Sequence, residues 1–348
     1  MAKEINYSKR KTVWSVLLTF FIILLCLAVI LIAFPLSTYI PRSGIKGTDY
    51  NSDIVKANPL IHEETSVIAN RGGSAYAPEN TLLAFKTMTA TYGTEAAVQM
   101  DVRVTKEGNL VVISDENLVR TSENSDKKFL VSEHTVSEMK QFNMGYNFQE
   151  NGEYVYRNAD AETLADLRIL TLNEALSYFN DYATEQGKTI QDINFYISIK
   201  DSGDLGIRAA NRVYSTLLAY GITANTVVEA LSDTVAVYID GMINQSKKRV
   251  DKRMIRTASE YEIWEFYFNA MFNLDLSKKE VGYQVLSLPY RDYVVNFAKS
   301  PIVDYAHKYG IAVDFWTVNG KVDIAYVSSC GADAVITDNT GDALRMLN

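Results

Sequence analysis

Short apolar runs alternate with stretches of helical spacing along most of this chain. The runs are rich in β-branched and aromatic residues and have the length of buried strands. The predicted strands are residues 67–71, 96–101, 193–199, 226–231, 253–257, 283–288, 312–317 and 334–337. Eight strands that alternate with helices indicate a parallel sheet, either closed as a (β/α)8 barrel or open and doubly wound.

Two of the intervening helices have clear ends in the sequence. Apolar residues recur every four positions over 205–217, and the pattern stops at Gly221, a residue that favours helix C-termini. A second helix opens at Ser300-Pro301 and ends at Gly310. Both are predicted to cover the sheet.

The region after the second strand is longer than a simple connection. Residues 102–114 predict a hairpin that turns at Lys106-Glu107-Gly108. Residues 116–170 are polar and rich in Asn and Glu, and they are predicted to form an insertion after strand 2.

The N-terminus departs from the alternating pattern. Residues 13–34 form a run of 22 without a charged side chain. At about 1.5 Å per residue, a helix of this length reaches about the 30 Å of a bilayer core. A small-residue cleavage site does not follow it, and its apolar residues are not confined to one face. We therefore predict an uncleaved transmembrane signal anchor over residues 13–35.

Charge predicts the orientation of this anchor. The tail, residues 1–12, carries four basic residues and one acidic residue, which favours the cytoplasmic side. The remaining chain has 30 basic and 41 acidic residues, a balance that excludes a nucleic-acid partner because phosphate backbones need a basic face. We expect a single-pass protein of the cell membrane, with a linker over 36–65 and an extracellular domain over 66–348.

Several motifs along the domain together resemble one family. They read Asn70-Arg71-Gly72, Gln99-Met100-Asp101, Ser114-Asp115, Ser198-Ile199-Lys200, Trp316-Thr317-Val318-Asn319 and Gly331 to Asp338. In this order they are similar to the His-Arg-Gly, Glu-x-Asp, His-Asp, Glu-x-Lys, Trp-Thr-Val-Asn and Gly-Val-Asp-Gly-Ile-Ile-Thr-Asp motifs of the glycerophosphodiester phosphodiesterase (GDPD) family. The resemblance spans about residues 66–348. It implies a closed TIM barrel of the phospholipase C-like phosphodiesterase superfamily.

The chain departs from the family at the positions that carry chemistry. The family uses two histidines for proton transfer, and these positions hold Asn70 and Ser114, which do not titrate near neutral pH. Its Mg²⁺ or Ca²⁺ is held by three carboxylates, where this chain has Gln99, Asp101 and Ser198. We therefore expect no functional catalytic pair, no metal and no other cofactor.

Other family positions are kept. The resemblance implies that Arg71, Lys200, Trp316, Asn319 and Asp115 bind a ligand, with the two basic residues suited to phosphate oxygens. An alternative interpretation is that Arg71 and Lys200 pair with Asp101 and Asp115 for structural reasons.

Two functional hypotheses remain. The first is a membrane-anchored pseudoenzyme that binds a glycerophosphodiester, a polyol-phosphate ligand of the cell envelope, or a membrane protein partner. The second is an active phosphodiesterase that hydrolyses glycerophosphodiesters by altered, metal-poor chemistry. Replacements concentrated in the catalytic set, with the scaffold motifs preserved, favour the first.

Overall fold

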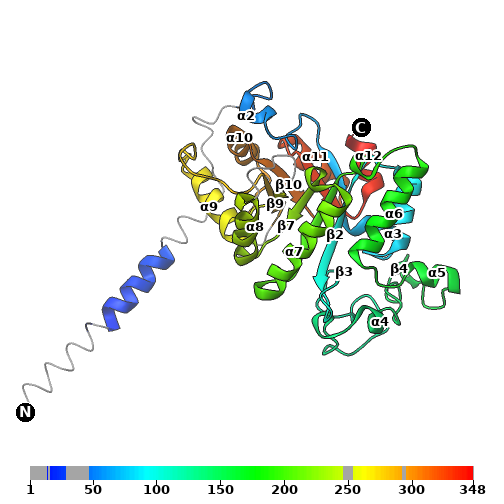
Figure 1. Ribbon diagram of the computed structural model, residues 1–348. Helices are drawn as coiled ribbons and strands as arrows, with labels where there is room; N and C mark the ends of the chain where they lie inside the picture. Colours follow the sequence, from blue (N-terminus) through cyan, green and yellow to red (C-terminus); the bar gives the residue numbers. More distant parts are fainter. Residues whose placement is uncertain (1–13, 15, 29–46, 246–253, 292–294, 348) are drawn as a thin grey trace, which may run out of the picture.

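Eight parallel strands form a nearly closed barrel in the computed structural model, which describes residues 14, 16–28, 47–245, 254–291 and 295–347 (Figure 1). In spatial order they are β8 (Ile255–Arg256), β7 (Thr226–Glu229), β6 (Phe195–Ile199), β2 (Ala97–Val104), β1 (Ser66–Ala69), β11 (Ala334–Thr337), β10 (Ala312–Trp316) and β9 (Val285–Pro289). The first and last strands meet through a parallel bridge between Thr257 and Val285, where the Ala258 amide also donates to the Val285 carbonyl at 2.8 Å. The barrel prediction is confirmed, and the open sheet is excluded.

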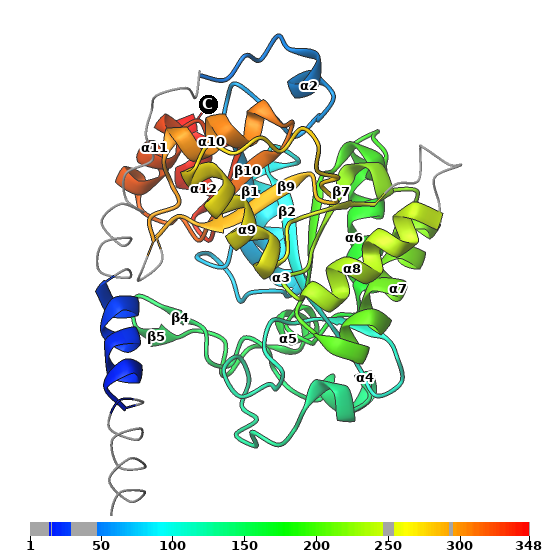
Figure 2. The same ribbon diagram turned by 90° about the vertical axis from the view of Figure 1, so that its left-hand side faces the viewer.

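Helices cover the outside of the barrel (Figures 1 and 2). They are α3 (Leu82–Tyr92), α6 (Leu172–Glu185), α7 (Gly203–Tyr220), α8 (Asp233–Gln245), α9 (Glu260–Met271), α10 (Ser300–Lys308), α11 (Lys321–Ser329) and α12 (Thr340–Leu347). The predicted ends of α7 and α10 agree with the structure, since Gly221 and Gly310 both adopt a φ of 70° just after them. Such left-handed residues end helices at little cost only when they are glycine.

The layer between helices and barrel is apolar and rich in aromatic rings. Phe179 of α6 packs between Phe85 of α3 and Phe195 of β6, with ring centroids 5.3 and 5.4 Å apart. All three side chains are fully buried. Tilted and edge-on contacts of this kind add to the burial energy, and they fix the barrel wall that carries the loops above it.

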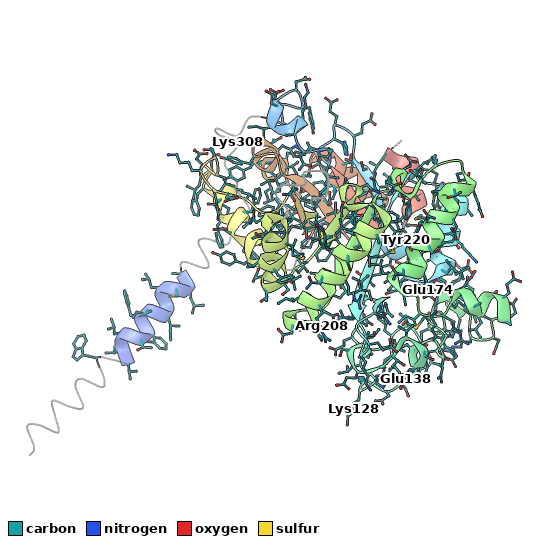
Figure 3. All side chains as sticks on the ribbon, viewed as in Figure 1. Lys128, Glu138, Glu174, Arg208, Tyr220 and Lys308 are labelled. Atoms are coloured by element: carbon teal, nitrogen blue, oxygen red, sulfur yellow. The ribbon has the colours of Figure 1, made fainter. Side chains whose placement is uncertain are left out.

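The insertion after strand 2 lies at the carboxyl end of the barrel, opposite α2 (Figure 1). The predicted hairpin is present: β3 (Leu110–Val112) pairs antiparallel with β2, and Gly108 in the turn has a φ of 81°. Its other elements are η2 (Val131–Glu133), α4 (Val136–Met139), β4 (Gln149–Glu150), β5 (Glu153–Tyr154) and α5 (Ala161–Asp166). Lys128 and Glu138 are exposed at its outer edge (Figure 3).

Residues 47–65, which the sequence assigned to a linker, pack against the amino end of the barrel. They contain the short helix α2 (Asp53–Lys56). The Asn58 side-chain amide donates to the carbonyls of Gln284 and Gly310, both at 2.9 Å, and the His62 amide donates to Asp333 at 2.9 Å. This segment therefore closes the end of the barrel opposite to the insertion.

Residues 16–28 are helical (Figure 1). Their side chains are exposed. Within the described parts of the chain, no helix has both the length and the apolar character needed to cross a membrane. The predicted anchor, residues 13–35, is described only at residues 14 and 16–28. The predicted cytoplasmic tail and residues 36–46 of the predicted linker lie outside the described residues.

Candidate functional site

A cavity of ≈ 160 Å³ opens at the carboxyl ends of the strands. Every one of the eight parallel strands, or the residues directly after it, contributes to its wall. The lining residues are Asn70, Arg71, Gln99, Asp101, Ser198, Lys200, Glu229, Leu231, Thr257, Ser287, Trp316, Thr317 and Ile336. Active sites of TIM barrels lie at this end of the barrel, so this cavity is the candidate functional site.

Asp101 is the centre of the charged part of the cavity. Its side chain is 1% exposed, with Arg71 Nε 2.8 Å from one carboxylate oxygen and Lys200 Nζ 3.6 Å from the other. The amides of Gln99 and Asn80 donate to it at 3.0 and 3.3 Å. Burial alone would raise the pKa of Asp101, but Lys200, Arg71 and the two amides outweigh it and lower the pKa. The carboxylate is therefore ionised and has four partners.

The backbone of Arg71 is held in an uncommon conformation. It lies in η1 (Asn70–Gly72), directly after β1, with φ 52° and ψ 31°. Left-handed backbone at a residue with a side chain costs on the order of 1–3 kcal/mol. The Arg71 amide donates to the Gln99 side chain at 2.8 Å, and its carbonyl accepts from the Asn80 amide at 2.9 Å. These bonds stabilise the turn that directs the guanidinium toward Asp101.

The ion pairs continue outward from Arg71 to the insertion. Arg71 Nη1 donates to Glu79 at 2.9 Å, and Glu79 accepts both Nη atoms of Arg120 at 2.7 Å. Arg120 also donates to Asp115, with Nε–Oδ2 at 2.7 Å. Asp115, predicted as a ligand-binding residue, is therefore the outer end of an ion-pair chain and does not line the cavity.

Two more predicted residues, Asn319 and Ser114, do not line the cavity. Asn319 donates to Asp338 at 2.7 Å, and Asn70 donates to the other oxygen of the same carboxylate at 2.7 Å. Ser114 is buried, and its carbonyl accepts from Arg103 Nε at 2.8 Å. Asn319 therefore joins the loops after β10 and β11 to the Asn70 turn.

Glu229 is a cavity residue that the sequence did not single out. It ends β7, and its neighbour in strand register is Ser198 of β6, which in turn pairs with Asp101 of β2. Burial raises the pKa of the Glu229 carboxyl and Asp101 adds to this, while Lys200 and hydrogen bonds from Gln99 and Ser287 act in the opposite direction. The signal in the sequence was a single acidic residue at the end of an apolar predicted strand.

The chain has three histidines, all among the described residues, and none of them lines the cavity. His62 lies in the segment at the amino end of the barrel. His134 stacks on Phe129 in the insertion, with ring centroids 3.5 Å apart. His307 of α10 is buried and lies 2.8 Å from Asp333. Imidazole proton transfer therefore has no residue at this site.

The cavity does not fit a divalent cation either. Mg²⁺ and Ca²⁺ take six or more oxygen ligands with several carboxylates among them. Among the described residues, no group of three or more His, Cys, Asp or Glu side chains is placed to hold a metal ion. Each oxygen of Asp101 already accepts from an amide and has a cation nearby, and Gln99 and Ser198 supply no charge.

The TIM barrel with a charged pocket at its carboxyl end fits the phospholipase C-like superfamily. The family comparison is more specific: the sequence profile of the Glycerophosphoryl diester phosphodiesterase family matches residues 71–342. The chain belongs to this family.

Individual relatives agree with this assignment. A glycerophosphodiester phosphodiesterase of Caldanaerobacter subterraneus subsp. tengcongensis is 25% identical over 292 residues, covering 82% of this chain and 98% of that protein. The structure of an Oleispira antarctica phosphodiesterase in complex with the product sn-glycerol-3-phosphate matches with a TM-score of 0.58 and 17% identity, over 81% of this chain and 96% of that one. The glycerophosphodiester phosphodiesterase of Thermotoga maritima matches with a TM-score of 0.54 and 22% identity, over 82% and 98%.

Proposed function

We propose that this protein is a membrane-anchored, extracytoplasmic member of the family that binds a glycerophosphodiester or polyol-phosphate ligand and does not hydrolyse it by the family's mechanism. The observation that carries the proposal is the environment of Asp101. Two cations and two amides surround this carboxylate, in a cavity to which the three histidines of the chain do not contribute.

The case for a phosphate ligand rests on the two cations. Arg71 and Lys200 line the cavity, and their side chains are 26% and 29% exposed, so each keeps a surface toward its open part. Lys200 has one ion pair, a long one to Asp101, among the described residues, and an ammonium carries three donors. Trp316 and Leu231 supply an apolar wall. A small organic phosphate suits such a mixture of cationic, hydroxyl and apolar groups.

Calorimetry tests the binding. The full chain in detergent micelles with chelator is titrated with sn-glycerol 3-phosphate and with glycerophosphoglycerol. We expect saturable heat from the wild type, and about 10- to 100-fold weaker binding by Arg71→Ala and Lys200→Met, the scale of one charge-assisted hydrogen bond. Lys86→Met removes a surface cation that pairs with Asp166 and is the matched control. Absence of heat from the folded wild type contradicts the proposal.

A second candidate function is hydrolysis by metal-poor chemistry, and Glu229 favours it. This carboxyl lies in the cavity with Lys200, and its pKa is raised, the direction that a proton donor needs. The assay is release of glycerol phosphate from glycerophosphoglycerol in chelator. If the wild type hydrolyses the diester in chelator and Glu229→Gln does not, hydrolysis replaces binding as the function of the site. If chelator abolishes the turnover of the wild type, both proposals are contradicted.

The anchor and its orientation are supported by the sequence of the N-terminus. The uncharged run of 22 residues and the basic tail before it favour a helix with its N-terminus in the cytoplasm. Protease added to intact protoplasts should then remove the barrel domain, and lysed protoplasts give the reference for complete digestion. Protection of the domain in intact cells contradicts this orientation.

A further inference from the structure

Glu229 supplies a carboxyl to the cavity from the strand next to β6. Ser198 occupies the position of one family carboxylate, and Glu229 is its partner in register on the next strand. The side chain lines the same cavity as Asp101 and Lys200. Ser287 donates to it at a long 3.4 Å. The pocket therefore holds a second carboxyl that the family motifs do not account for.

The positive and negative charges of the ion pairs at the site are equal in number without Glu229. Arg71, Arg120 and Lys200 pair with Asp101, Glu79 and Asp115 through contacts of 2.7–3.6 Å. Three cations therefore face three carboxylates, and the sum of these charges is zero. Glu229 stands outside this chain of pairs, so its ionisation adds a negative charge to the pocket that these pairs do not balance.

The groups that face Glu229 come from four strands. Lys200, after β6, favours the charged carboxylate, and Asp101 of β2 opposes it. Asp314 of β10 and Tyr196 of β6 also lie within its electrostatic reach, since Glu229 raises the pKa of both groups. Gln99 and Ser287 are its hydrogen-bond partners. Burial and the Asp101 carboxylate thus oppose the charge on Glu229, while Lys200 and two hydrogen bonds favour it.

We propose that Glu229 couples ligand binding to proton uptake: its carboxyl is protonated in the complex and donates a hydrogen bond to an oxygen of a singly charged phosphodiester. The inference rests on the proposed function and names its ligand class. One proton moves from solvent to the Glu229 carboxylate, and no other bond changes. A diester brings one negative charge to the site, whereas a phosphomonoester dianion brings two, which favours the diester.

Proton linkage in calorimetry tests this step. Glycerophosphoglycerol is the probe, because its phosphodiester charge does not titrate between about pH 5 and 8. The full chain is titrated across this range in buffers of different ionisation enthalpy. We expect the wild type to take up as much as one proton per ligand and to lose up to about tenfold in affinity per pH unit above the pKa of Glu229.

Two variants and a control complete the experiment. Glu229→Gln, which keeps a donor without a charge, should bind with no proton uptake and a flat pH profile; Glu229→Ala should also take up no proton but bind more weakly. Glu260→Gln, on the exposed start of α9, should behave as wild type.

Wild-type binding without proton uptake, or an unchanged pH slope in Glu229→Gln, overturns the coupling and leaves the proposed function standing. Absence of heat from wild type and all variants overturns both.

Discussion

Arg71 Nε lies 2.8 Å from Oδ2 of Asp101, so a guanidinium faces the buried carboxylate at the centre of the cavity. Arg71 follows β1, and Asp101 lies on the neighbouring strand β2. The charge of Asp101 is therefore balanced within the protein, and Lys200 takes part at its other oxygen.

Removing that carboxylate should strengthen anion binding. In Asp101→Asn, Arg71 and Lys200 lose a competing negative charge, and we expect about tenfold tighter binding of glycerophosphoglycerol, equivalent to about 1.4 kcal/mol. Calorimetry in chelator measures it, with circular dichroism to verify the fold. Asp166→Asn, on the surface, is the matched control. Equal or weaker binding by a folded Asp101→Asn means that the two cations do not form the anion site.

A variant with carboxylates at positions 99 and 198 should bind a divalent metal ion. Gln99→Glu and Ser198→Glu together place three carboxylates at the end of β2 and β6, the ligand type that divalent cations require. We expect saturable Mn²⁺ or Ca²⁺ binding by the double variant in calorimetry, weaker binding by each single variant and none by the wild type. Saturable binding of Mn²⁺ or Ca²⁺ by the wild type at this site would show that its residues do hold a metal ion.

Stability should depend on pH through Glu229. Its pKa is raised in the folded chain, so the unfolded chain ionises first as pH rises. The contribution of Glu229 to stability is therefore fully present below its unfolded pKa of about 4.3, and it is lost as pH rises through the raised folded value. Glu229→Gln removes this loss. The increase in melting temperature of the variant over the wild type should therefore be larger at pH 8 than at pH 4. A gain that is equal at both pH values contradicts the shift.

The barrel seam should depend on one buried cation. Arg256 of β8 is 0% exposed and donates to Asp240 at 2.6 and 2.7 Å and to Glu262 at 2.7 and 2.8 Å. Arg256→Met leaves two carboxylates without a cation, and we expect a loss of about 3–5 kcal/mol in urea unfolding. Replacing all three residues by apolar ones should restore most of it. A loss within about 0.5 kcal/mol, typical of exposed sites, would show that the cluster is not structurally important.

Most of the barrel was predictable because its strands are short, apolar and repeated. All eight predicted strands are present, and the rule that strand ends face the ligand placed Arg71, Gln99 and Ser198 in one cavity. Long-range polar contacts were not predictable. Asp115 is paired with Arg120 of the insertion, an arrangement that depends on how a 55-residue segment folds back on the barrel.

The packing of residues 47–65 against the barrel was not predictable either. Its contacts use the backbone carbonyls of Gln284 and Gly310, which every residue has and no sequence pattern marks. Glu229 was missed for a different reason: one acidic residue at the end of a strand matches no motif, and its importance arises from its register with Ser198 and Asp101.

Residues 48–65 and the cavity occupy opposite ends of the barrel. Thr48 contacts Asp304 and His307 on α10 at 3.0 and 2.8 Å, and no residue of this segment lines the cavity. A substitution in the segment can therefore change the stability of the barrel without altering any group that a ligand in the cavity would touch.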